Sequence, residues 1–295
     1  MQLKQPETFD RQVDKLTEHH IIVSDRAHTK AALSYNNYYR ISGYALQYRI
    51  RPDKSDCVDG TRFDDILRIY QFDFDLRNCL RKYVEIAEIY YRTQIAYYFS
   101  LAKCSNPPHD QHYNEDNYYN KIGFNEIINS FSRQRNYYKD SLIVKHHKTK
   151  YDNKLPLWAI VELLSFSDLS KLYSAMYFSE QDLIAEAIGT GSEMLKNHLH
   201  CLSVLRNKCA HAARLYNTEF NPPAQFSKRF LRNNLDVLNN TLFAYLLILI
   251  KRLPDRISKM RCVKELSSII NNRPDGVDLK LMGFPDNWEE LLNKF

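Results

Sequence analysis

Glycine and proline are scarce in this sequence of 295 residues, which contains seven of the former and ten of the latter. Residues 62–103 contain neither. Both residue types end helices and form turns, so their scarcity argues against a turn-rich β architecture and favours long helices. The sequence also contains no clear internal repeat and no strand-like alternation of polar and apolar residues. It therefore predicts an all-α fold, a bundle of helices.

Paired cysteine motifs and long apolar runs are lacking too. The six cysteines form no CxxC pair and no compact disulfide framework, which is typical of a reducing compartment. The amino-terminal segment, MQLKQPETFDRQVDKL, has no apolar core of a secretory signal. The longest apolar run, LFAYLLILI at residues 242–250, is about half as long as a bilayer-spanning helix. We therefore expect a cytoplasmic protein that has no membrane partner.

Motifs of common catalytic and cofactor sites are missing as well. There is no Walker-type loop, no GxSxG nucleophile elbow and no dinucleotide-binding fingerprint. The stretch PDGVDLK at residues 274–280 has the residue types of a metal-dependent nuclease, but they are too closely spaced, and we interpret it as a turn. The pairs His109 with His112 and His198 with His200 lack the further ligands of a zinc site. We expect neither a metal ion nor another cofactor.

Aromatic and basic residues, in contrast, are abundant. There are 21 Tyr and 15 Phe, and 41 Lys and Arg exceed 35 Asp and Glu, which gives a formal net charge of +6. Lysine and arginine bind phosphates and exposed rings stack on unpaired bases, so a basic run with interleaved rings predicts contact with RNA. A solvated surface that carries scattered tyrosines is the alternative. The run comprises Arg133, Arg135, Tyr137, Tyr138, Lys139, Lys145, His146, His147, Lys148, Lys150, Tyr151 and Lys154.

Apolar residues at helical spacing predict most of the helices. The longest is expected over residues 61–103, where Glu88 precedes Arg92 by four residues, the favourable order for an ion pair. Residues 104–123 are polar and are expected to form a loop. Other helices are expected over 7–20, 25–35, from Asn125, from Pro156, over 192–216 and over 226–252, the last with Leu231, Leu235, Leu238, Leu242, Leu246 and Leu249 on its inner face.

The distribution of these segments suggests three parts of the chain. Residues 1–60 form an N-terminal helical and aromatic segment, and residues 61–252 form the main helical domain. A second basic run begins at Lys251, so residues 253–295 form a basic C-terminal segment. We expect that segment to pack on the main domain.

A polar stretch, RNKCAH at residues 206–211, follows the apolar stripe of the helix expected over 192–216. A helix turns by about 100° per residue, so Asn207 shares a face with His211 and its amide can orient the imidazole. Arg206 and His211 lie about 140° apart on such a helix. They can still line two walls of one groove, above all if a second copy of the helix faces them. The alternatives are a core or capping role for His211 and an acidic partner for Arg206.

The pattern R-N-x-x-x-H on a late helix of an all-α bundle resembles the HEPN superfamily of ribonucleases and their relatives. More narrowly, the chain resembles the Abi-like (AbiD/AbiF) abortive-infection proteins of bacteria. The stretches that carry this resemblance are YYRISGY (38–44), IYQFDFDLR (69–77), EIYYRTQIA (88–96), LPLWAIVELLSFSDLSKLY (155–173), LRNKCAHAARLYN (205–217) and MGFPDNW (282–288). Two positions depart from the expected pattern: Ser167 stands in place of Gly, and Tyr216 in place of a frequent Trp.

The resemblance implies an HEPN-like helical bundle with an N-terminal helical extension and additional helices. It also implies metal-independent cleavage of RNA, which leaves a 2′,3′-cyclic phosphate and a 5′-hydroxyl. His211 suits proton transfer because an imidazole titrates near neutral pH. Arg206 suits the phosphate because its planar guanidinium pairs with two oxygens and stays charged. Asn207 would hold the imidazole or contact the phosphate.

Further residues and partners follow from the same resemblance. Candidate supporting residues are Arg214 and Asn217, with helix capping as the alternative, and Glu88 and Arg92, with an ordinary helix pair as the alternative; Arg40 and Tyr44 are candidate RNA contacts, with a core or interface position as the alternative. The implied partners are a second copy of the chain, an RNA substrate and an inhibitory small noncoding RNA that controls a toxin. A HEPN module that binds RNA or regulates without cleavage is the alternative function, and a protein partner of an adjacent toxin or antitoxin is a third.

Overall fold

The computed structural model describes residue 3, residues 5–151 and residues 154–294. Within these residues the fold is all-α, as the sequence predicts, with fourteen α-helices, five short 3-10 helices and no strand. The α-helices are α1 (Phe9–Glu18), α2 (Arg26–Asn36), α3 (Tyr38–Ser42), α4 (Phe63–Lys103), α5 (Lys121–Tyr137), α6 (Leu142–Lys150), α7 (Leu157–Ile160), α8 (Phe166–Ala175), α9 (Phe178–Ala187), α10 (Ser192–Ala210), α11 (Lys228–Asn233), α12 (Leu242–Arg252), α13 (Arg256–Asn271) and α14 (Trp288–Asn293).

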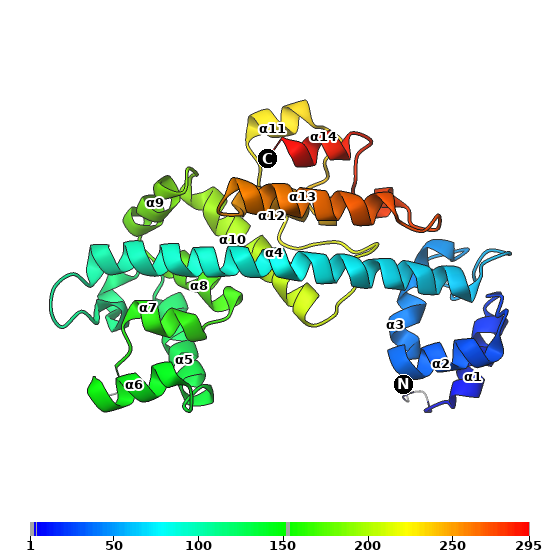
Figure 1. Ribbon diagram of the computed structural model, residues 1–295, viewed down its shortest axis with the longest axis horizontal. Helices are drawn as coiled ribbons and strands as arrows, with labels where there is room; N and C mark the ends of the chain where they lie inside the picture. Colours follow the sequence, from blue (N-terminus) through cyan, green and yellow to red (C-terminus); the bar gives the residue numbers. More distant parts are fainter. Residues whose placement is uncertain (1–2, 4, 152–153, 295) are drawn as a thin grey trace.

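Helix α4, with 41 residues, is the central element and corresponds to the long helix predicted over residues 61–103. Acidic Asp64 and Asp65 lie in its first turn and Lys103 in its last, which matches the sign of the helix dipole at each end. At a rise of about 1.5 Å per residue it is about 60 Å long. Figure 1 shows that it runs across the width of the molecule. Buried residues occur from Phe63 to Phe99, so α4 packs against other helices along its whole length.

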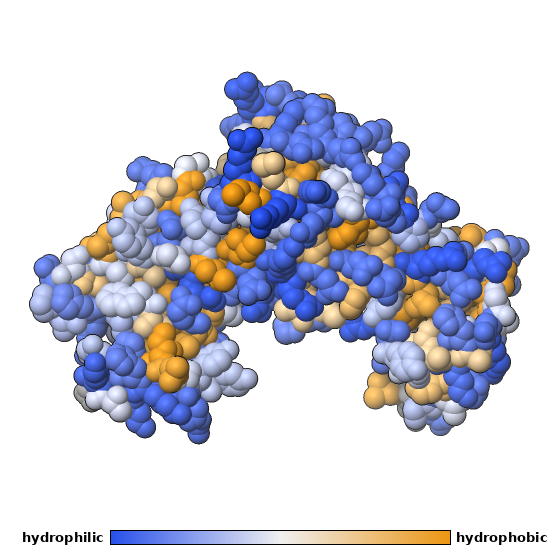
Figure 2. All heavy atoms as spheres, viewed as in Figure 1, coloured by the Kyte–Doolittle hydropathy of each residue, from blue (hydrophilic) through white to orange (hydrophobic). Residues whose placement is uncertain are grey.

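The remaining helices pack around three regions of α4. Helices α1–α3 lie at its N-terminal end, helices α5–α8 lie toward its C-terminal end, and α10, α12 and α13 pack along its middle (Figure 1). Of the segment 253–295, α13 packs on α4 and α12, and α14 packs on α12 and α13. The two end units project to the same side of α4, so the molecule has the shape of an arch with a broad concavity between them (Figure 2).

The longest apolar run of the sequence forms part of the hydrophobic core. It lies in α12, where residues 242–250 are all buried. In the part of the chain that the structure describes, no helix is both long and apolar enough to cross a bilayer. All six cysteines are buried and carry free thiols.

The helix predicted over residues 192–216 ends at Ala210 instead, as α10. Ala212 adopts a left-handed conformation with φ of 52°, and the Ala213 amide donates back to the Lys208 carbonyl at 2.8 Å. This is the hydrogen bond of a Schellman-type helix end. His211 is therefore the C-cap of α10 and does not lie inside the helix.

The prediction of a single helix over residues 226–252 is wrong, because two helices lie in this segment. Helix α11 ends at Asn233, and α12 begins at Leu242. Asn234 ends α11, because its side-chain amide donates to the Phe230 carbonyl at 2.8 Å and its backbone leaves the helical region. The leucines that the prediction placed on the inner face before residue 242 are instead exposed: Leu231, Leu235 and Leu238.

Candidate functional site

Helices α4 and α10 pack together in opposite directions, so the end of α10 meets a row of polar side chains on α4. Arg81 donates from Nη2 to the Cys209 carbonyl at 3.1 Å, and Arg77 from Nη1 to the Ala213 carbonyl at 3.5 Å. The carbonyls at a helix C-terminus have no partner within the helix, and cations are favoured there. The two arginines thus hold the last turn of α10 and the residues that follow it.

Asp73, one turn before Arg77, fastens the chain beyond α10. Its carboxylate accepts from the backbone amides of Leu215 and Tyr216, at 3.2 and 3.0 Å, and forms a buried ion pair with Arg77. The Tyr44 hydroxyl also donates to this carboxylate. Burial raises the pKa of Asp73, and the Arg77 charge and these hydrogen bonds act in the opposite direction. The predicted contact of Tyr44 with RNA is wrong, because the side chain is buried in this ion pair.

Arg206 lies on the surface beside two residues of α4. Its Nε donates to Glu88 Oε2 at 3.2 Å, and Arg92 Nη2 donates to the other Glu88 oxygen at 2.9 Å. The ion pair predicted between Glu88 and Arg92 is thus confirmed. Glu88 is also the acidic partner of Arg206 that the sequence analysis gave as an alternative. Arg92 donates further to the Leu164 carbonyl at 3.0 Å, which fixes its position.

A cavity of about 330 Å³ opens beside Arg206. Its lining includes three arginines, Arg81, Arg92 and Arg206, against two glutamates, Glu85 and Glu88, so it carries an excess of positive charge. The Arg206 side chain is 36% exposed, whereas that of Glu88 is 9% exposed. The guanidinium is thus held from the protein side and remains open to an anion from outside.

Asn207 does not orient His211, contrary to the expectation from helical spacing. Its Nδ2 donates to Ser167 Oγ at 3.0 Å, and its Oδ1 accepts from Arg206 Nη1 at 3.4 Å. Ser167 is one of the two positions that depart from the family pattern, and a glycine there would offer no side-chain acceptor. At the other, Tyr216, the hydroxyl donates to Gln47 Oε1 and accepts from the Asp278 amide at 3.0 Å. Both departures therefore make hydrogen bonds at or near the candidate site.

His211 lies at the exposed end of α10 and lines a different cavity, of about 550 Å³. Arg40 and Arg214 line it too: Arg40 donates to the Ala212 carbonyl and Arg214 to the Gly43 carbonyl. Burial, and after it the Arg214 charge, lowers the pKa of nearby Lys208. One chain thus places Arg206 and His211 at the same helix end but in separate cavities.

The candidate supporting residues lie close to this helix end without capping it. Arg214 joins the segment after α10 to Gly43, the first residue of the 3-10 helix that follows α3. Asn217 adopts a left-handed conformation with φ of 46°, seven residues beyond the end of α10. Capping of α10, the alternative for both residues, is contradicted, because the helix ends at Ala210.

The basic run predicted to bind RNA lies on the end of α5, on α6 and on the segments around them. Tyr137, Tyr138 and Tyr151 are exposed, as are most of the basic side chains. Some of the basic side chains have acidic neighbours. Arg133 Nη2 lies 3.8 Å from Asp168 Oδ1, and Lys145 Nζ lies 3.5 Å from Asp140 Oδ1. Rings and cations thus share one accessible surface, at a different part of the fold from the end of α10 (Figure 1).

Sequence reasoning missed the polar row of α4 that holds the end of α10. Asp73, Arg77 and Arg81 are spaced by four residues, which is a detectable signal for one helix face. Asp73 and Arg77 also lie among Phe72, Leu76 and Leu80, which are apolar and buried. An ion pair embedded in such a face indicates a buried structural role, and this pattern was visible in the stretch IYQFDFDLR.

The family comparison covers the segment that contains the whole candidate site. The family model described as Abi-like protein matches residues 31–217, well over half of the chain. The comparisons with curated proteins and with solved structures gave no match. The match indicates abortive-infection defence as the setting in which the protein acts. By this match, the chain belongs to the Abi-like protein family.

Proposed function

We propose that this protein is a metal-independent endoribonuclease of the HEPN type, which acts as a toxin in bacterial abortive infection. The observation that carries the proposal is the placement of Arg206 and His211 at one end of α10, with both side chains accessible. Both belong to the segment that matches the Abi-like family. An accessible, fixed cation and an accessible imidazole at the same helix end are the two groups that RNA transesterification requires.

Arg206 stabilises the negative charge that develops on the phosphate. A guanidinium has five N–H donors, and the contacts with Glu88 and Asn207 use two of them, so three remain for phosphate oxygens. Glu88 shares its single charge between Arg206 and Arg92, which leaves the cavity attractive to an anion. Because Glu88 and Asn207 hold the group in place beforehand, little reorganisation is needed when the phosphate arrives.

His211 transfers the protons of the reaction. The ribose 2′-hydroxyl must lose a proton as its oxygen attacks phosphorus, and the 5′-oxygen must gain one as its bond to phosphorus breaks. Each chain has one histidine in this motif, and that histidine does not share a cavity with Arg206. A two-fold dimer in which two α10 ends meet supplies a second His211 and a second Arg206 to one cleft. We therefore propose that the active form is a homodimer.

Substitution of the two residues tests the nuclease. We expect His211→Ala and Arg206→Ala each to reduce cleavage of a single-stranded RNA by about 100-fold or more while RNA affinity stays near that of the parent. His200→Ala is the matched control, because His200 is an exposed histidine on the same helix. The products are identified by their 2′,3′-cyclic phosphate and 5′-hydroxyl ends. Cleavage by His211→Ala at the parental rate refutes the assignment.

A mixing experiment tests the composite site in the dimer. The Arg206→Ala and His211→Ala chains are each inactive alone in this proposal. After unfolding and refolding together, about half of the dimers contain one chain of each kind, and such a dimer joins Arg206 of one chain to His211 of the other. Activity returns if the two residues act across the dimer. It stays absent if each site takes both residues from one chain.

Control by a small noncoding RNA belongs to the same proposal, with the basic surface of α5 and α6 as its binding site. The ratio of absorbance at nucleic-acid and protein wavelengths tests it directly on protein purified from its bacterial host. We expect bound RNA of discrete size, and its removal should release nuclease activity. Protein that purifies without RNA and without activity contradicts this form of control.

A catalytically inactive module that binds or regulates RNA is the second candidate function. The observation that favours it is the close pairing of Arg206 with Glu88, together with the separate cavities of Arg206 and His211. This module would bind RNA but leave it intact. Parental protein that has been freed of bound RNA decides between the two, because only the nuclease cleaves the substrate.

A further inference from the structure

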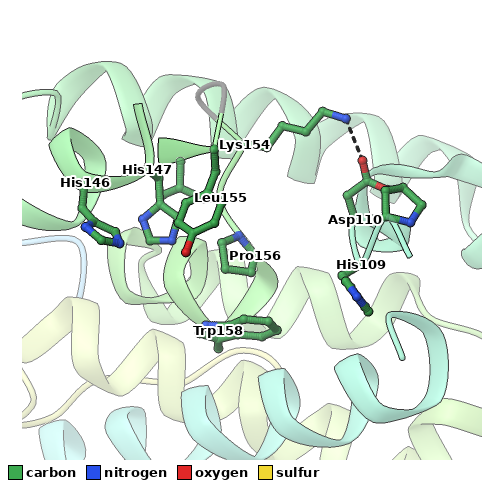
Figure 3. A pocket seen from close by; sticks show the side chains of 10 residues that line it. His109, Asp110, His146, His147, Lys154, Leu155, Pro156 and Trp158 are labelled. Atoms are coloured by element: carbon green, nitrogen blue, oxygen red, sulfur yellow. Dashed lines mark hydrogen bonds and ion pairs between the residues drawn. The ribbon is translucent and has the colours of Figure 1, made fainter. Parts of the chain in front are cut away.

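A cavity of about 590 Å³ lies between α6, the segment that leads into α7, and the loop after α4. None of its lining residues lines the cavities at Arg206 or His211. Figure 3 shows His146 and His147 on one side, His109 on the opposite side and the Trp158 ring beneath Pro156. The lining comprises Pro108, His109, Asp110, His146, His147, Tyr151, Lys154, Leu155, Pro156 and Trp158.

Aromatic rings provide much of the cavity wall. Trp158 is 56% exposed, whereas Trp288, the other tryptophan of the chain, is 9% exposed. The imidazole of His147 contacts two further rings, with centroid distances of 5.1 Å to His146 and 5.4 Å to Tyr151. A half-exposed tryptophan beside such a ring cluster presents flat apolar faces to the solvent, and these faces favour a planar ligand.

The polar groups of the wall are oriented by the backbone. His147 Nδ1 lies 2.8 Å from the Ile143 carbonyl, and His109 Nδ1 lies 2.8 Å from the Cys104 carbonyl. A carbonyl can only accept, so each Nδ1 carries a proton, and the tautomer with that single proton has Nε2 as an acceptor. The described residues, these histidines and Asp110 among them, contain no group of three or more side chains that could hold a metal ion. The acceptors therefore suit the N–H groups of an organic ring.

One lysine lines the cavity, and further lysines lie on the helix that forms one of its sides. Lys154 forms an ion pair with Asp110 at 2.8 Å (Figure 3). Lys145, Lys148 and Lys150 of α6 are exposed on the same element that supplies His146 and His147. A ligand that fits the cavity and its surroundings therefore combines a planar ring bearing N–H donors with a flanking chain of negative charge. A single-stranded nucleic acid has this combination.

We propose that this cavity holds one unstacked base of a single-stranded RNA, with its face on Trp158 and its neighbouring phosphates on the lysines of α6. The inference rests on the proposed function in that it takes RNA as the ligand, but it requires no cleavage. The base enters from the single strand, since a paired base is not free to leave its stack. The histidine acceptors favour bases that present an amino group.

Two measurements on the full-length His211→Ala chain test this site with a short single-stranded RNA of mixed sequence. Tryptophan fluorescence should be quenched on titration, because Trp158 is the exposed reporter and a stacked base contacts its ring. Anisotropy of a labelled RNA should show binding weakened about tenfold by Trp158→Ala, whereas Trp158→Phe keeps the affinity and loses the quenching. Phe178→Ala, which removes a similarly exposed ring outside the cavity, should leave both signals unchanged.

Several outcomes would overturn the base site. They are parental affinity in Trp158→Ala, absence of quenching by the single strand, or equal quenching by a duplex of the same sequence. A gel of the same RNA after incubation with chains that keep His211 reports cleavage separately. If the RNA quenches the tryptophan fluorescence normally but is never cut, even by the parental protein, the nuclease proposal is refuted and the base site is kept. If a Trp158→Ala chain that keeps His211 cuts and binds the RNA normally, only the base-site proposal is refuted.

Discussion

The buried carboxylate of Asp73 offers the sharpest test of how the end of α10 is held. Asp73→Ala removes the partner of Arg77, which is 1% exposed, and the acceptor of the Leu215 and Tyr216 amides. A buried charge left without its partner costs about 3–5 kcal/mol. The two unpaired amides add to this loss. Since domains unfold with about 5–15 kcal/mol, we expect Asp73→Ala to lose at least about 3 kcal/mol, a large share of the total.

Urea unfolding followed by circular dichroism measures this loss as a lower transition midpoint. Asp73→Asn is the matched control, because it keeps an acceptor for the amides and loses only the charge. We expect it to lose less than Asp73→Ala, because its amide oxygen still accepts hydrogen bonds at this position. The pair Asp73→Leu with Arg77→Met leaves no unpaired charge and should recover part of the loss of Asp73→Ala. A loss below about 1 kcal/mol for Asp73→Ala would refute the anchoring role.

Three other changes test separate features. Ala212→Gly should raise the free energy of unfolding by about 1 kcal/mol in urea, because Ala212 is held at a φ of 52° that glycine adopts without strain; no gain would contradict this. Ser167→Ala should slow RNA cleavage with unchanged RNA affinity, because Asn207 loses its acceptor; an unchanged rate would count against it. Burial lowers the pKa of His112 to about 4 and that of His198 to about 3. In the unfolded chain both rings gain their protons near pH 6.5, so stability is lost as the pH falls below that value. Each should cost about 2 kcal/mol between pH 7.5 and pH 5, and a flat urea midpoint across this range would refute it.

Local patterns of the sequence were sufficient for the main element of the fold. Helix α4 was predictable because its signals are local: no glycine or proline, and apolar residues such as Leu76 and Leu80 at helical spacing. The same holds for the pair of Glu88 and Arg92, which lie four residues apart on one helix. Both predictions depend only on residues that lie within a few positions of each other in the sequence.

The end of α10 was not predictable in this way. Nothing in the sequence marks Ala212 for a left-handed conformation, for which glycine is the usual residue. The amides that follow are instead held by Asp73, about 140 residues earlier in the chain. The contact between Glu88 and Arg206 is also long-range. Tertiary contacts of this kind outweigh local spacing: the His211 amide still donates to the Asn207 carbonyl at 3.0 Å, but the Asn207 side chain bonds Ser167 in place of the imidazole.

These contacts show where the rigidity of the candidate site comes from. Glu88 holds Arg206 near the start of the motif, and Asp73 holds Tyr216 near its end. Both anchors lie on the same uninterrupted helix, about 22 Å apart along its axis. His211 lies in the segment between the two anchored positions, so its place is set by the geometry of α4 as well as by α10. The helix that fixes the candidate site thus carries none of the three candidate catalytic residues.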